Sequence, residues 1–328
     1  MKKLIFLVIP VIIFHFIPLY CGELKLQLGT ESGIMNSDES SARTVLRLLG
    51  RFNYQQPTSK GALSVKIRIT PEGYYANQNR YILRHNADIA YNLPQSKSAW
   101  KFCLSAKNQV YALSSSDEFV QNVLITEGKY NKFLRENLTF CTGLSFVIRT
   151  MHSAPSQKLT AVQLTPGMEF GISKHSSFKT IIYLESFDIK GNERKNFGWR
   201  FGPQIIFQSK NISIFNICYQ LIFTDNSQQK KIFPEQHIDV LWGRPFYKKW
   251  AVFFYINYYL LHEYDPDVLP EIVYTPINTQ NWIYIQLGYD ITRRIELYNR
   301  NGYFYEEVRY GAQKIEGWQT LLGFNISF

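Results

Sequence analysis

Long hydrophobic runs are missing from most of this sequence. Beyond residue 22 there is no stretch of about 18 apolar residues, the length that an α-helix needs to span a membrane. Charged residues are also scarce, at 19% of the chain, compared with about a quarter of an average soluble domain. These shortages exclude a helical membrane protein beyond residue 22 and are unusual for a soluble protein.

Cysteine is sparse as well. Cys103, Cys141 and Cys218 follow the N-terminal segment, and their spacing matches no metal-ligand pattern. An odd number of cysteines argues against a disulfide framework, although one bridge between Cys103 and Cys141 stays open, with free thiols as the default. We expect neither a bound metal nor a cofactor.

Basic clusters are absent, although the formal net charge is +10. The lysines and arginines occur singly along the chain and form no patch or recognition motif, which argues against nucleic-acid binding. The positive charge instead suits anionic lipid headgroups or anionic solutes.

The N-terminal segment, MKKLIFLVIPVIIFHFIPLYCG, has the layout of a secretory signal peptide: two lysines, an apolar run and small residues. The alternative is a membrane-anchoring helix, but Pro10 and Pro18 favour cleavage. Cys21 is either the last signal residue or a lipidated first residue of the mature chain. We expect residues 1–22 to be the signal peptide and residues 23–328 to form a single domain.

Aromatic residues are abundant: 22 Tyr, 24 Phe and 6 Trp make up 16% of the chain. Many lie in segments where apolar residues recur at every second position, which is the period of a β-strand with one apolar face. Such segments include Leu63–Ile69, Trp100–Leu104, Leu138–Ile148 and Trp250–Tyr258. The pattern predicts an almost all-β chain, and the aromatic residues suit the interfacial belts of a membrane barrel.

The connections between these segments alternate between short and long, as expected for an up-and-down barrel. We expect short turns at 94–97, 174–177, 208–210, 244–249 and 292–294, and longer loops near 150–159, 189–196, 224–235, 264–280 and 306–314. Including FVQNVLIT (119–126) as a strand gives about 16 antiparallel strands, with 14 as the alternative. In register, the turn near Tyr247 pairs His237 with Asn257 and Trp242 with Val252, and the turn at 292–294 pairs Tyr289 with Leu297 and Ile291 with Ile295.

The last nine residues, TLLGFNISF, alternate apolar and small or polar side chains and end on an aromatic ring. Together with the signal-like N-terminus and the aromatic strands, they resemble the outer-membrane β-barrel proteins of Gram-negative bacteria. The resemblance implies an outer-membrane location next to lipopolysaccharide. It also implies that the barrel assembly machinery reads the last strand, at Trp318, Leu322, Phe324, Ile326 and Phe328.

If the apolar residues face lipid, the alternate residues face the interior. These expected lumen-lining residues are Lys66, Arg68, Asp88, Lys101, Glu169, Arg200, Gln204, Gln220, His237, Asp239, Asn257, Gln286, Asp290 and Glu296. A wettable, slightly basic wall in a barrel of this size predicts a porin-like channel for small polar solutes. The alternative is a closed interior, in which these residues pair with one another.

Two other functions stay open. His237 and Asp239 share a face near the barrel rim, where a histidine and a carboxylate can activate water in a hydrolase, but no accompanying nucleophile is evident. We therefore expect a non-enzyme. Alternatively, the loops serve adhesion or assembly, and Asp265, Asp267 and Glu271 then hold Ca²⁺ or bridge to lipopolysaccharide through divalent ions.

Overall fold

The computed structural model describes residues 23–36, 42–75, 80–112, 118–152, 157–191, 195–227, 229–261, 280–309 and 313–328. The expected signal peptide with Cys21, and the loop residues Asp265, Asp267 and Glu271, lie outside these ranges. Within them, no helix has the length and apolar character needed to cross a membrane.

Strands account for nearly all of the described residues. In chain order they are β1 (Glu23–Asn36), β2 (Arg43–Pro57), β3 (Ala62–Tyr75), β4 (Arg80–Pro94), β5 (Ser98–Ala112), β6 (Glu118–Arg135), β7 (Leu138–His152), β8 (Gln157–Leu164), β9 (Gly167–Ser173), β10 (Ser176–Lys190), β11 (Lys195–Lys210), β12 (Ile214–Asn226), β13 (Gln229–Tyr247), β14 (Trp250–Leu261), β15 (Gln280–Asp290), β16 (Ile295–Arg309) and β17 (Gln313–Ser327).

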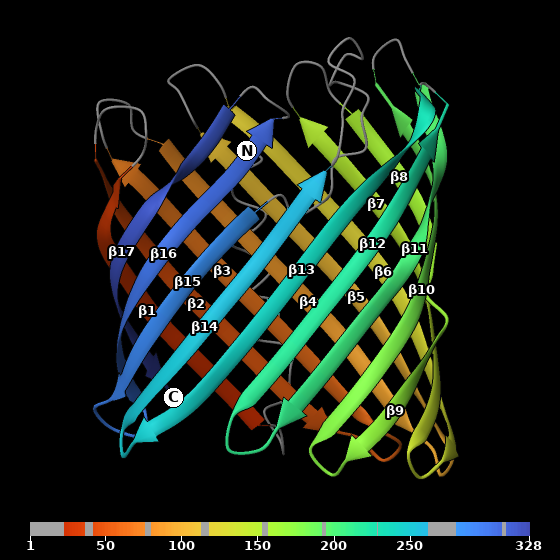
Figure 1. The fold of residues 1–328 in the computed structure, drawn as a ribbon, viewed down its shortest axis with the longest axis horizontal. Coiled ribbons are helices and arrows are strands. Elements are labelled where there is room, and N and C mark those ends of the chain that lie inside the picture. The colour runs from red at the N-terminus through yellow and green to blue at the C-terminus, as the bar shows by residue number, and fades with distance from the viewer. Residues whose placement is uncertain are drawn as a thin grey trace.

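The strands form a closed antiparallel barrel (Figure 1), in which sequence neighbours pair, apart from β8 with β9, and β17 pairs with β1. Strands β8 and β9 share one position, because both pair with β7 and β10 in one continuous register. Pro166 lies between them and has no N–H to donate, so the strand is interrupted there. The 17 described strands therefore fill 16 positions, which confirms the predicted up-and-down barrel of 16 strands.

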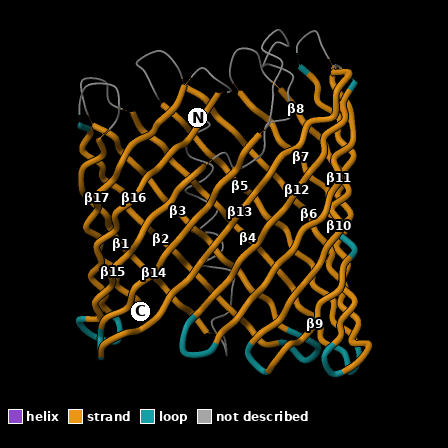
Figure 2. Tube along the Cα trace, viewed as in Figure 1, coloured by secondary structure: helices purple, strands orange, loops and turns teal. Residues whose placement is uncertain are grey.

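The two ends of the barrel differ (Figure 2). The short described turns gather at one end, which we call the turn end, and we call the opposite end of the described strands the loop end. The predicted turn at 208–210 is wrong: β11 continues to Lys210, and the turn is at 211–213. The predicted loop at 224–235 is also mostly strand. In both segments polar residues face the barrel interior, and such residues look like loop in a sequence.

The predicted register between β13 and β14 is wrong by two residues. β13 continues to Tyr247, through residues expected in the turn, whereas β14 begins at Trp250 as expected, so only Lys248 and Lys249 form the turn, with φ +38° at Lys248. His237 therefore lies opposite Tyr259, and Trp242 opposite Phe254. A shift of two residues leaves each side chain on its predicted face. Tyr289 pairs with Leu297 as predicted, but Ile291 lies in the turn beyond β15.

The outward face of the barrel is apolar. Large side chains on it are strongly exposed, for example Phe146 at 52%, Trp199 at 62% and Ile285 at 53%. Aromatic pairs flank this band at both ends: Trp100 with Tyr130 and Trp250 with Tyr289 near the turns, with ring centroids 4.5 and 4.8 Å apart, and Tyr75 with Tyr81 and Tyr303 with Trp318 near the loops. An apolar band between two aromatic girdles is the arrangement that lipid requires.

Candidate functional site: the barrel interior

Contacts between distant strands identify the inward face. Arg84 on β4 forms an ion pair with Glu306 on β16, although β17, β1, β2 and β3 separate these two strands in the sheet. Two such side chains can meet only through the interior. Arg84 and Glu306 therefore mark the inward face, and the strand register identifies the residues of every other strand that lie on the same face.

The loop end of the interior contains an apolar cluster. Its side chains come from β1 to β6, β16 and β17 and are at most 7% exposed: Met35, Val45, Tyr74, Ile82, Tyr111, Phe119, Phe304, Ile315 and Leu321. The rings of Tyr74 and Phe304, from opposite sides of the interior, stack with centroids 6.4 Å apart. The prediction that apolar residues face lipid while the alternate face is polar thus fails at this end, where wall side chains pack against one another.

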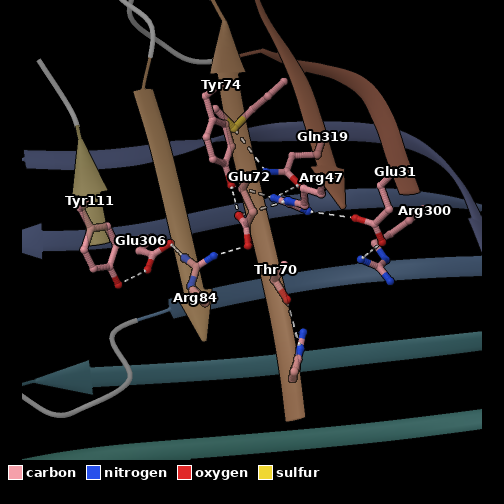
Figure 3. A network of polar contacts seen from close by, with 12 residues as sticks. Glu31, Arg47, Thr70, Glu72, Tyr74, Arg84, Tyr111, Arg300, Glu306 and Gln319 are labelled. Atoms are coloured by element: carbon pink, nitrogen blue, oxygen red, sulfur yellow. Dashed lines mark hydrogen bonds and ion pairs between the residues drawn. The ribbon is translucent and has the colours of Figure 1, made fainter. Parts of the chain in front are cut away.

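A network of arginines and glutamates lies against this cluster and joins the same two walls (Figure 3). Arg47 is at its centre: its Nε lies 3.3 Å from Glu72 Oε2, and its Nη1 lies 3.4 Å from Glu31 Oε2. Its Nη2 donates to the Tyr74 hydroxyl at 2.9 Å and to Gln319 Oε1 at 3.2 Å. Arg47 therefore connects β1, β2, β3 and β17 through one side chain.

Arg84 extends the network across the interior. Its guanidinium forms ion pairs with both Glu72 and Glu306, and Glu306 also accepts a hydrogen bond from the Tyr111 hydroxyl at 3.0 Å. A fork-shaped guanidinium can bind two carboxylates at once, which is why arginine suits this bridging position better than lysine.

Arg300 completes the network on the opposite wall. Its Nη1 lies 2.7 Å from Glu31 Oε1, which also accepts a hydrogen bond from the Tyr298 hydroxyl at 2.7 Å. Three arginines and three glutamates are thereby joined: Arg47, Arg84, Arg300, Glu31, Glu72 and Glu306. We call this group the interwall network. Its formal charge is zero, so the buried ions compensate one another.

A second buried cluster lies on the other side of the interior. Arg200 on β11 lies between Glu185 on β10 and Glu235 on β13, at 3.2 and 2.6 Å. Glu235 also accepts hydrogen bonds from the hydroxyls of Thr224 at 2.6 Å and Tyr259 at 2.7 Å. Arg200 was expected from the sequence to line the lumen; its two carboxylate partners were not.

The register places all fourteen expected lumen-lining residues on the inward face, but the structure brings only some of them together. Those with described polar partners are Arg68 with Thr70, Asp88 with Ser105, Arg200 with its glutamates, Gln204 with Cys218, His237 with Asp239 and Asn257, Gln286 with Arg300, and Glu296 with Asn325. Lys66, Lys101 and Asp290 are exposed and form no ion pair with the described residues.

His237 and Asp239 do lie together, as their spacing predicts. His237 Nε2 is 3.2 Å from Asp239 Oδ2 and 3.0 Å from Asn257 Oδ1, so one ring nitrogen faces two oxygen atoms of the wall. Within the described residues, no group of three histidine, cysteine or acidic side chains is placed to hold a metal ion. Cys103, Cys141 and Cys218 are free thiols, so the bridge between Cys103 and Cys141 does not form.

The last strand closes the barrel. Trp318, Leu322, Phe324 and Ile326 face outward on β17, and Trp318 and Phe328 are each 61% exposed. The backbone N–H of Phe328 donates to the Leu26 carbonyl at 2.8 Å, and its own carbonyl accepts from the Leu26 N–H at 3.2 Å. The terminal aromatic residue is therefore hydrogen-bonded to β1 at the seam, where the last strand meets the first.

Sequence reasoning missed the interwall network: none of its six residues is among the expected lumen-lining residues. Glu31, Arg47 and Glu72 alternate along their strands with outward residues, so parity alone assigns them to the interior. They went unnoticed because apolar inward neighbours such as Met35, Val45 and Tyr74 obscure the apolar–polar alternation. A search for charged residues with the parity of Lys66 and Arg68 would have found Glu72 on the same strand.

Comparisons with known proteins agree with this architecture. No protein-family model matches the sequence, and no curated protein matches it. Among solved structures, CdiB from Acinetobacter baumannii matches with a TM-score of 0.54 and 8% identity, covering 93% of this chain and 60% of that chain. The copper transporter OprC (TM-score 0.47, 6% identity, 94% and 80% covered) and Acinetobacter baumannii OccAB4 (0.45, 9%, 94% and 98%) are also similar. This chain spans 60% of the length of CdiB. With its apolar exterior and closed ring of strands, the chain has the fold of Gram-negative outer-membrane β-barrels.

Proposed function

We propose that the protein is an outer-membrane channel for small polar solutes with a mild preference for anions. One observation carries this proposal: a closed barrel of 16 strand positions is apolar outside and carries charged side chains inside. Barrels of about this strand number are wide enough for an aqueous path. Exposed Lys66, Arg68 and Lys101 on the inner wall support the preference for anions.

The interwall network favours a second candidate, a barrel that conducts nothing and serves as a structural, assembly or adhesion protein. Its ion pairs and the apolar cluster bring opposite walls together and occupy part of the interior at the loop end. The channel proposal requires a water-filled path beside these groups. A hydrolase with His237 and Asp239 has no support beyond the contact of these two side chains.

Reconstitution in a planar bilayer tests the channel. We expect stepwise conductance with mild anion selectivity, reversed to cation selectivity by the double substitution Lys66→Glu and Arg68→Glu. The control is Lys132→Glu, which reverses one positive charge on the outward face of β6 and should leave selectivity unaltered. A folded barrel that stays silent would overturn the channel proposal and favour the non-conducting candidate.

Export and assembly form part of the proposal. Residues 1–22 act as a cleaved signal peptide, and the outward residues of β17 with Phe328 are read by the barrel assembly machinery. The seam contacts of Phe328 are backbone contacts, so its ring is free for such recognition. Phe328→Ala should lower the amount of folded protein in the outer membrane while leaving refolding in detergent unchanged; equal defects in both would contradict a recognition role.

A further inference from the structure

Two arginines of the inner wall lie directly opposite each other on neighbouring strands. Arg51 on β2 pairs in register with Arg68 on β3, and both side chains face the interior and are exposed. Like charges that face each other across a strand pair destabilise the sheet. This juxtaposition is therefore unfavourable unless something negative offsets it.

The described surroundings supply little compensation. No described carboxylate lies within ion-pair distance of either arginine, and Glu72, the nearest acidic group along β3, is bound to Arg47 and Arg84. Arg51 reaches only the Gln27 amide oxygen and Arg68 only the Thr70 hydroxyl, each at 3.4 Å. Both contacts are long for hydrogen bonds from nitrogen, so most of the guanidinium donors remain available.

The groups around this pair extend the site. Lys66 lies two residues before Arg68 on the same face; it pairs in register with Asp88, which in turn accepts a hydrogen bond from Ser105. Across the interior, Tyr255 lies within electrostatic range of Arg51, and Tyr284 of Arg68. The two tyrosine rings are in contact, with centroids 4.7 Å apart, and Tyr284 lies under Arg300. These groups leave an excess of positive charge on one wall, facing aromatic rings on the other.

We propose that Arg51 and Arg68 form a binding site for a small oxoanion inside the barrel. Planar guanidinium groups match the paired oxygens of carboxylates and phosphates, which a spherical chloride ion cannot reproduce. The site rests on the proposed channel function, because it selects oxoanion-bearing solutes from those that enter the lumen. Lys66 adds attraction, and Tyr255 and Tyr284 contact the remainder of the solute.

Direct binding to the full chain in detergent tests the site independently of conduction. Titration calorimetry with inorganic phosphate and with acetate should show binding of at least one of them, weakened about tenfold by Arg51→Gln or Arg68→Gln, since each removes charge-assisted hydrogen bonds. Tighter binding of phosphate would indicate phosphorylated solutes, and tighter binding of acetate carboxylated ones. The matched control is Lys129→Gln, which removes a lysine already paired with Glu127 at 2.9 Å.

Two results would overturn the site: no oxoanion binding by the unaltered protein, or equal losses in Arg51→Gln and Lys129→Gln. Planar-bilayer recordings of the same preparations separate this outcome from failure of the channel. Conductance without oxoanion binding leaves the channel and removes the site. Oxoanion binding without conductance leaves the site and removes the channel.

Discussion

Charged side chains of the inner wall have different environments in two regions of the barrel. In the interwall network near the loop end, arginines and glutamates are buried and joined in pairs across the interior. Nearer the turn end, Arg51, Lys66, Arg68 and Lys101 are exposed, and no described ion pair includes them. Both sets occupy equivalent inward positions on neighbouring strands, so position on the strand alone does not determine their environment.

Solvation explains the difference. Where side chains from opposite walls meet and exclude water, an ion is tolerated only with a partner, and the network meets this condition with three charges of each sign. Where the wall stays wet, an unpaired cation costs little and remains available to solutes. The first region holds the walls together, and the second is suited to binding.

The largest expected effect comes from removing a shared partner in the network. Arg84→Met leaves Glu72 and Glu306 without their common cation, and breaking a buried pair in this way costs about 3–5 kcal/mol of unfolding free energy. Urea unfolding in phospholipid vesicles measures it. Lys129→Met, which breaks a partly exposed pair, should cost at most about 1 kcal/mol. Equal losses in the two variants would abolish the proposed distinction between the regions.

A smaller loss of unfolding free energy is expected for a substitution at Gly323, where the Tyr298 ring covers the backbone. A Cβ at this position would lie 2.1 Å from Tyr298 Cζ, so Gly323→Ala must displace the ring and weaken its hydrogen bond to Glu31. Overpacking of this kind costs about 1–3 kcal/mol. At Gly171, on β9 near the turn end, the nearest atom would lie 3.6 Å away. We expect Gly171→Ala to leave the unfolding midpoint unchanged or slightly raised. A loss of stability in Gly171→Ala as large as in Gly323→Ala would contradict overpacking against Tyr298 as the cause.

The smallest expected change in unfolding free energy is a gain, not a loss. Arg51→Gln removes one of two opposed cations, so the unfolding free energy should stay the same or rise by up to about 1 kcal/mol. The measurement is done without phosphate or carboxylate in the buffer, because a bound oxoanion would reverse the sign. A clear loss of stability in anion-free buffer would mean that Arg51 has a stabilising partner.

Much of the fold was predictable from the sequence. Period-two segments such as Leu138–Ile148 assign outward and inward faces without reference to any partner strand, and the alternation of short and long connections yields 16 strands. The register was harder to predict: the pairing of His237 with Tyr259 depends on a two-residue turn at Lys248 and Lys249, and the mixed segment RPFYKK (244–249) does not show where the strand ends. An error of two residues leaves every face correct, so the architecture survives it.

The sequence by itself determined which side chains face outward and which face inward, because that choice depends only on the parity of positions along each strand. The tertiary structure alone decided which inward charges meet. Arg84 and Glu306 are 222 residues apart and come together only because the barrel closes and brings β4 and β16 to face each other. Arg51 and Arg68 have no described carboxylate within ion-pair distance, and they are tolerated unpaired because the folded chain leaves both exposed.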